Sequence, residues 1–167
     1  ITSGSASVLG FDSVTEFRQA RKLIGLSPQE LNFDVFFSIG ELLELQAGYY
    51  GLSNKEAKER TTIMLEQFGL TEKRNSRARE LSGGMKRRVQ IAKSLVHDPK
   101  IVILDEPTAG VDIELRHMLW NYLRQINEEG KTILLTTHYI EEAEQLCETV
   151  SIINDGKIIA TDSPDKL

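Results

Sequence analysis

The strongest constraint on the fold is an uninterrupted apolar run near the middle of the chain, Ile101–Leu104, which is followed at once by two acidic residues. A short run of this kind is typical of a parallel strand that is buried on both faces. Thr132–Thr136 shows a second buried-strand pattern, and Arg21–Leu26 is a third strand candidate. Helices must cover the faces of a parallel sheet, so these runs predict an α/β fold.

Helical spacing fills most of the sequence between the strand candidates. Apolar residues from Leu115 to Ile126 recur every three or four positions, and Phe36 to about Glu80 is mainly helical. Ser53 and Glu56 form a capping-box pattern at the start of one of these helices. We expect three parts within one domain: core strands in residues 1–35, an inserted helical subdomain in residues 36–98, and the rest of the core in residues 99–167.

Composition excludes several classes of protein. The chain has 167 residues, a formal charge of −5 and one cysteine, Cys147, which has no internal disulfide partner and fits a reducing compartment. No apolar run approaches the roughly 20 residues that a membrane-spanning helix needs. The acidic balance gives no support for a nucleic-acid surface. We therefore interpret Lys86–Arg88 as a solvated helix face.

Polar residues follow two of the predicted strands at their carboxyl ends. Asp105 and Glu106 follow the first, and Thr136, Thr137 and His138 end the second. Ligands bind at this edge in open α/β sheets. One carboxylate there can hold Mg²⁺ while the other polarises an attacking water. The alternative is that polar residues only mark where each strand meets solvent, and that the histidine is structural.

A second candidate site precedes a predicted helix. Ser82 is a natural N-cap, and Gly83 and Gly84 let a ligand approach the backbone closely. The free amides of a helix start suit a phosphate group. The alternative is a capped helix with a flexible lead-in. Asp112 is open to the same simple interpretation, as the N-cap of the helix that begins near Ile113.

The order of these motifs is far more specific than any one of them. Along the chain come SPQ ending at Gln29, then LSGGMKRR, ILDEP, AGVD and TTH. In this order the chain closely resembles the nucleotide-binding domain of ATP-binding cassette (ABC) transporters, and most of all ATPase subunits of bacterial drug and polysaccharide exporters. The resemblance implies a P-loop NTPase-like ABC ATPase core, with a mainly parallel sheet and an inserted α-helical subdomain.

The resemblance also implies a role for each motif residue. Asp105 would hold Mg²⁺, Glu106 would be the catalytic base, and His138 would contact the γ-phosphate of ATP. Gln29 would sense the magnesium and the attacking water, and would link the site to a membrane partner. The residues expected to act across a dimer are Ser82, Gly83 and Gly84, which would close over the opposite subunit's ATP, and Asp112, which would communicate between subunits.

Cofactors and partners follow from the same resemblance. The expected cofactors are ATP and Mg²⁺. The expected partners are a second ABC ATPase domain, arranged head to tail, and a transmembrane permease subunit on which the helical subdomain docks. Nucleic acid binding and direct membrane insertion are not expected. The implied location is the cytoplasm of a bacterium, peripheral on the inner face of the cell membrane.

The chain departs from the family pattern in one respect. The phosphate-binding loop G-x-x-x-x-G-K-[ST] is not in the sequence; the nearest match, at Gly130, has Gln125 where the first glycine belongs and precedes a strand. We expect the N-terminal part of the core to be missing and both chain ends to be cuts. This chain by itself should bind ATP very weakly and not hydrolyse it. An absent central strand would also leave unpaired backbone and favour self-association.

Two other functions fit parts of the pattern. One is a non-catalytic interaction module that lends its signature motif, LSGGMKRR at residues 81–88, to a partner. The other is a soluble ABC ATPase of DNA repair or translation, although such proteins carry long coiled coils or paired cassettes that do not appear in this sequence. A phosphate-binding loop upstream of Ile1 in the reading frame would favour an enzyme, and a start codon near Ile1 would favour the module.

Overall fold

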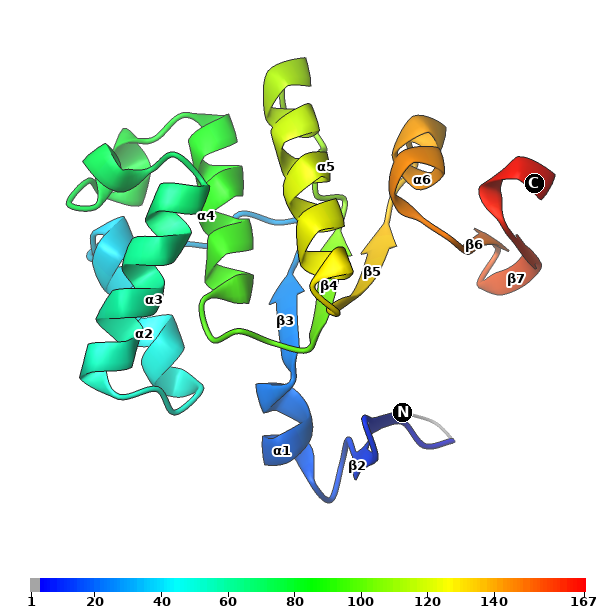
Figure 1. The fold of residues 1–167 in the computed structure, drawn as a ribbon, viewed down its shortest axis with the longest axis horizontal. Helices are drawn as coiled ribbons and strands as arrows, with labels where there is room; N and C mark the ends of the chain where they lie inside the picture. The colour runs from blue at the N-terminus through cyan, green and yellow to red at the C-terminus, as the bar shows by residue number, and fades with distance from the viewer. Residues whose placement is uncertain (1–3) are drawn as a thin grey trace.

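The centre of the computed structural model, which describes residues 4–167, is a three-stranded parallel sheet. Its order is β3 (Ile24–Ser27), β4 (Ile101–Asp105) and β5 (Thr132–Thr136), as Figure 1 shows. The three strands are parallel because helices return the chain to the same end of the sheet each time. The predicted α/β class is confirmed.

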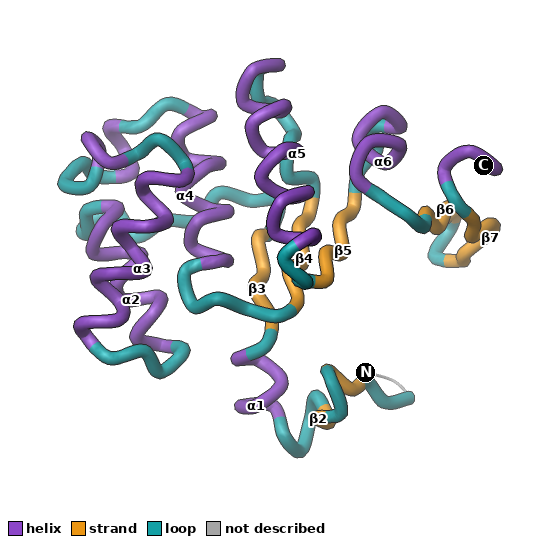
Figure 2. The backbone as a smooth tube through the Cα atoms, in the orientation of Figure 1, coloured by secondary structure: helices purple, strands orange, loops and turns teal. Residues whose placement is uncertain are grey.

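Helices form the rest of the molecule's main body (Figure 2). Between β3 and β4 lie α2 (Ile39–Tyr49), α3 (Asn54–Gln67) and α4 (Gly83–Leu95), with two 3₁₀ turns, η1 (Thr71–Lys73) and η2 (Ala78–Glu80). After β4 come α5 (Ile113–Glu128) and α6 (Ile140–Leu146). The remaining elements are α1 (Phe17–Lys22), the hairpins β1 (Ser7–Val8) with β2 (Phe11–Asp12) and β6 (Val150–Asn154) with β7 (Lys157–Asp162), and η3 (Pro164–Lys166).

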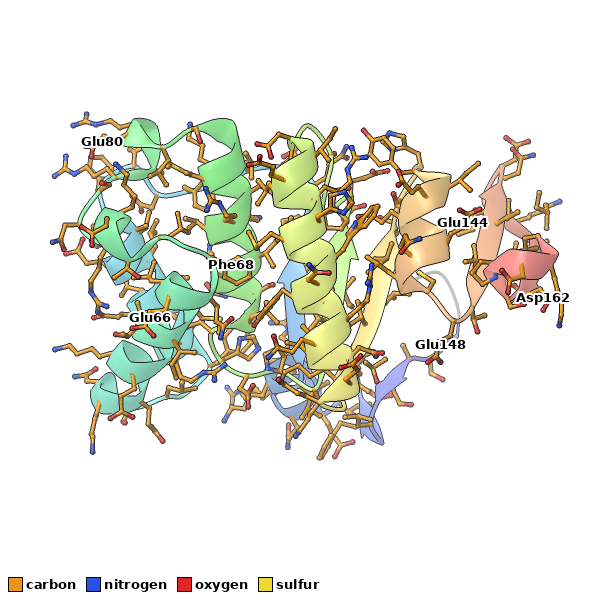
Figure 3. The ribbon with its side chains drawn as sticks, turned by 45° about the horizontal axis from the view of Figure 1, so that its top comes forward. Glu66, Phe68, Glu80, Glu144, Glu148 and Asp162 are labelled. Atoms are coloured by element: carbon orange, nitrogen blue, oxygen red, sulfur yellow. The ribbon has the colours of Figure 1, made fainter. Side chains whose placement is uncertain are left out.

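Local sequence signals set the helix starts. The predicted capping box is present at α3, where Ser53 accepts a hydrogen bond from the Glu56 amide and the Glu56 side chain accepts one from the Ser53 amide. Ser38 and Glu41 form a second capping box that starts α2. Phe68, labelled in Figure 3, is fully buried and meets Tyr122 of α5 edge-on at 5.0 Å, which joins the helical layer to α5.

The sheet is buried on one face only, which corrects the expectation for β4 and β5. On the covered face, Val102 and Leu104 are fully buried. On the other face, Leu26, Ile103 and Leu134 lie in register across the three strands, and Leu26 and Leu134 are 57% and 58% exposed. An apolar run therefore marks a strand of a parallel sheet here without marking burial on both faces. In residues 4–167, no helix has the length and apolar content to cross a bilayer.

The prediction of a strand over Arg21–Leu26 was wrong for its first residues. Arg21 and Lys22 are the last turn of α1, and the strand begins only at Ile24. Basic residues favour the last turn of a helix because its carbonyl end is partially negative. From Ile24 the chain is held by pairing with Ile101.

A glycine lets α4 pack closely on β3. A Cβ atom at Gly25 would lie 2.1 Å from the carbonyl oxygen of Ser94 and 2.8 Å from the Pro99 ring. No side chain fits in that space, so Gly25 sets the distance between the end of α4 and the sheet.

Candidate active site

The carboxyl ends of β4 and β5 meet at one edge of the sheet, as the sequence predicted. Asp105 pairs in register with Thr136, and the Thr136 hydroxyl donates a hydrogen bond to the Asp105 carboxylate. The amide of Glu106 donates to the Thr136 carbonyl at 3.0 Å. Both acidic residues are therefore fixed to the end of the neighbouring strand.

Glu106 and His138 contact each other directly. His138 Nδ1 lies 2.8 Å from Glu106 Oε1, although the two residues are 32 positions apart in the chain. The imidazole is 64% exposed and the Glu106 side chain 16% exposed, so the histidine lies on the solvent side of the carboxylate. Adjacent parallel strands that end together bring this pair into contact.

Glu106 has an unusual backbone conformation and an unpaired carboxylate oxygen. Its backbone φ is +51°, in the left-handed region that residues with a side chain rarely adopt. Its second oxygen, Oε2, is buried and has no hydrogen-bond partner in the described residues. Strained backbone and unpaired buried acceptors are both unfavourable, and both are concentrated at functional sites in proteins. Glu106 therefore keeps one buried, unpaired acceptor oxygen at the sheet edge.

The two carboxylates suit Mg²⁺ better than they suit a metal ion whose ligands all come from protein side chains. Residues 4–167 contain no cluster of three or more His, Cys, Asp or Glu side chains able to hold a metal ion. Mg²⁺ is commonly held by one or two carboxylates together with waters and substrate phosphates. Asp105 and Glu106 provide two carboxylates at this edge, which is the number that such an ion needs from the protein.

The signature residues lie at the start of α4. Ser82 is the N-cap and accepts a hydrogen bond from the Met85 amide at 3.3 Å. A Cβ at Gly83 would meet no atom of residues 4–167 within 4 Å, whereas one at Gly84 would lie 3.0 Å from Leu115. The start of α4 is therefore open to a ligand at Gly83 and packed against the first turn of α5 at Gly84.

The structure shows Asp112 in the simpler of the two roles considered for it from the sequence. It is the N-cap of α5, where its carboxylate accepts a hydrogen bond from the Leu115 amide at 2.8 Å. Gly84 lies against the same residue, Leu115. The signature motif and Asp112 are thus neighbours in the fold.

Gln29 lies in the loop that follows β3 and is exposed. Within the described chain, no hydrogen bond joins its side chain to Asp105 or Glu106. Two side chains of α4 bind the carbonyls on either side of it: Arg87 donates to Pro28 at 3.2 Å, and Gln90 donates to Glu30 at 3.3 Å.

The interpretation of Lys86–Arg88 as a solvated face was wrong for Arg87, which is only 5% exposed. Burial lowers the pKa of the Arg87 guanidinium, and the carboxylates of Asp105 and Glu106 oppose that shift. A buried polar face on a helix gives no signal in hydrophobic periodicity, so neither Arg87 nor Gln90 stands out in the sequence.

Comparisons with known proteins agree on one family. The family model described as "ABC transporter" matches residues 2–109. The chain is 42% identical to Nod factor export ATP-binding protein I of Rhizobium sp. (strain N33) over 165 residues, which are 99% of this chain and 54% of that protein. The protein of the same name from Burkholderia thailandensis is 43% identical over the same shares. The chain thus spans about half the length of these relatives.

Solved structures show the same fold. An ATP-binding subunit of an ABC transporter superposes with a TM-score of 0.89 at 28% identity, over 99% of this chain and 69% of that one. An ATP-binding cassette solved as a dimer in a post-hydrolysis state, bound to ADP and Pi, gives a TM-score of 0.88 at 25% identity, over 98% of this chain and 74% of that one.

Proposed function

The chain belongs to the ABC transporter family, and from this premise we propose that it forms part of an ATP-hydrolysing subunit that drives export across a membrane. The observation that carries the proposal is the contact between His138 and Glu106 at the end of β4, with Glu106 Oε2 left buried and unpaired. Export is proposed because the relatives named above are export ATP-binding proteins.

The site residues then take distinct roles. Glu106 accepts a proton from the attacking water, or orients it, through its carboxylate. His138 holds the other Glu106 oxygen and, being largely exposed, also reaches a phosphate oxygen. Phosphoryl transfer needs positioning and charge neutralisation more than covalent chemistry, and a fixed carboxylate with an adjacent imidazole supplies positioning. Gln29 completes the set from the loop after β3.

Magnesium would be held by Asp105 and Gln29. When bound, the ion would neutralise charge on the transferred phosphoryl group. The Thr136 hydroxyl orients the Asp105 carboxylate toward the same edge as Glu106. ATP and Mg²⁺ are the proposed ligands of the complete site.

The proposed assembly contains two ATPase domains and a permease. Ser82, Gly83 and Gly84 would close over ATP held by the second domain, in a head-to-tail dimer, and Asp112 would contact that domain. The open space beside Gly83 supports this role. The proposed location is the cytoplasmic face of a bacterial membrane, reached through the permease.

The proposed division of the chain is unchanged: residues 1–35 and 99–167 form the core, and residues 36–98 form the helical subdomain. This subdomain would dock on the permease. Exposed aromatic side chains at Phe36 and Tyr49 support that surface, because solvent-exposed aromatic groups are enriched at protein interfaces.

Substituting Glu106 tests the function in the full-length protein that carries this sequence, reconstituted with its permease. Glu106→Gln keeps the shape but removes the base, so ATP binding should persist while ATP hydrolysis falls by roughly 10² to 10⁴. Glu141→Gln, an exposed carboxylate in the first turn of α6, is the matched control and should leave turnover unchanged. Unchanged hydrolysis in Glu106→Gln would refute the assigned role.

A further inference from the structure

The loop after β3 has little backbone structure to hold it in place. Within the described chain, residues 30–36 make no backbone–backbone hydrogen bonds outside the regular elements. The amide of Phe36 bonds to the Asp34 side chain, but that contact lies inside the loop. The position of Gln29, at the start of this loop, must therefore be set by contacts from outside it.

Two side chains of α4 provide those contacts. Arg87 Nη1 donates to the carbonyl of Pro28 at 3.2 Å, and Gln90 Nε2 donates to the carbonyl of Glu30 at 3.3 Å. The two acceptors are the carbonyls of the residues immediately before and after Gln29. Both donors are 5% exposed, so water does not compete freely for these bonds.

Arg87 also connects the loop to the acidic edge of the sheet. Its guanidinium is buried, and the negative charges of Asp105 and Glu106 help to keep it protonated. A charged donor makes a stronger hydrogen bond than a neutral one. The same cation therefore holds the loop carbonyl and interacts electrostatically with both carboxylates, while its helix begins at the signature residues Ser82 and Gly83.

We propose that Arg87 and Gln90 are positioning residues, which hold Gln29 at the acidic sheet edge and make its position depend on that of α4. The proposal rests on the function proposed above. A shift of α4 moves both donors, and with them the carbonyls that flank Gln29. The start of α4 and the loop after β3 then respond as one unit to whatever binds at either end.

The first test measures the loop directly in the full-length protein that carries this sequence. Glu-specific protease cleaves after Glu30, the residue whose carbonyl Gln90 holds, and mass spectrometry gives the cleavage rate at this bond under native conditions. Arg87→Met and Gln90→Leu should each speed this cleavage at least tenfold relative to other glutamate sites. Arg87→Lys, which keeps a charged donor, should restore most of the protection.

The matched control is Arg88→Met. Arg88 lies on the same helix and donates to a carbonyl in the same way, but its acceptor is Phe68 at the end of α3. Its loss should lower stability without a selective effect on Glu30, and cleavage there should change less than threefold. Equal acceleration in Arg88→Met and Arg87→Met would mean general unfolding and would overturn the proposal.

The second test uses ATP hydrolysis by the full-length protein with its permease. Arg87→Met and Gln90→Leu should lower kcat about tenfold while the KM for ATP changes less than threefold, because the loop positions Gln29 and does not cradle the nucleotide. Faster cleavage after Glu30 with unchanged kcat would overturn the positioning role. Absence of hydrolysis in the wild-type protein would refute the proposed function, and the protease test would still decide whether Arg87 and Gln90 hold the loop after β3.

Discussion

Replacing Gly25 by Ala should destabilise the chain far more than its one methyl group suggests. A Cβ there would lie 2.1 Å from the Ser94 carbonyl oxygen, and ordinary contact begins near 3.4 Å. The gap between β3 and α4 therefore has to open by about 1.3 Å. The new Cβ is attached to the backbone of β3 and meets a backbone oxygen of α4, so no flexible side chain can move aside. Protein interiors are packed as densely as organic crystals, which leaves little room for such a shift. Overpacking typically costs about 1–3 kcal/mol, and we expect the upper end, about 3 kcal/mol.

Gly48→Ala is the matched control, since it makes the same chemical change in an open place. Gly48 lies on the exposed side of α2, and a Cβ there would meet no atom of the described part of the chain within 4 Å. Alanine favours a helix over glycine by about 0.8–1.0 kcal/mol, so this variant should be more stable than the wild type.

Urea unfolding of the chain, followed by far-ultraviolet circular dichroism, measures both effects. The midpoint should fall for Gly25→Ala and rise for Gly48→Ala, with unchanged slopes. A free energy of unfolding for Gly25→Ala within about 0.5 kcal/mol of the wild type, the usual range for neutral surface changes, would refute the close-packing argument.

Three further predictions concern the chain itself. Burial lowers the pKa of His97, so the unfolded chain binds a proton at this residue more readily than the folded chain does. The free energy of unfolding should therefore fall as the pH drops below about 6.5, by at most ~1.4 kcal/mol per pH unit. In urea titrations from about pH 7.5 to about pH 5, His97→Phe should remove this part of the pH dependence. The open sheet face should drive self-association, so sedimentation should show oligomers at micromolar concentration that Leu134→Lys reduces and Ile63→Lys, on α3, does not; a monomeric wild type would contradict this. Isothermal titration with Mg-ATP should give no micromolar binding to the 167-residue chain, because the phosphate-binding loop is not in its sequence, and micromolar affinity would overturn that expectation.

The contact between Glu106 and His138 could be predicted because it depends on topology. Each residue follows a strand candidate, and neighbouring parallel strands end at the same edge. The N-cap role of Asp112 was equally accessible, because capping depends on a few adjacent residues.

Burial was predicted less well. Arg87 lies on α4, which packs against β3 and β4 of the sheet and against α2 and α3. The polar face of α4 is therefore covered by protein and not by water. Leu134 shows the reverse, since its strand has the composition of a buried strand but one of its faces is open. Periodicity reports which residues are apolar, whereas burial depends on what packs against them, and that is a property of the whole fold.

The left-handed backbone at Glu106 sets stability against the catalytic role proposed for this residue. Only glycine, and to a smaller degree asparagine, adopts that conformation without strain. Selection of variants for heat resistance alone should therefore favour Glu106→Gly, which relaxes the turn after β4 and also removes the unpaired carboxylate oxygen. On the role proposed above for Glu106, the same change would abolish ATP hydrolysis, so a gain in heat resistance at this position would come with a loss of turnover.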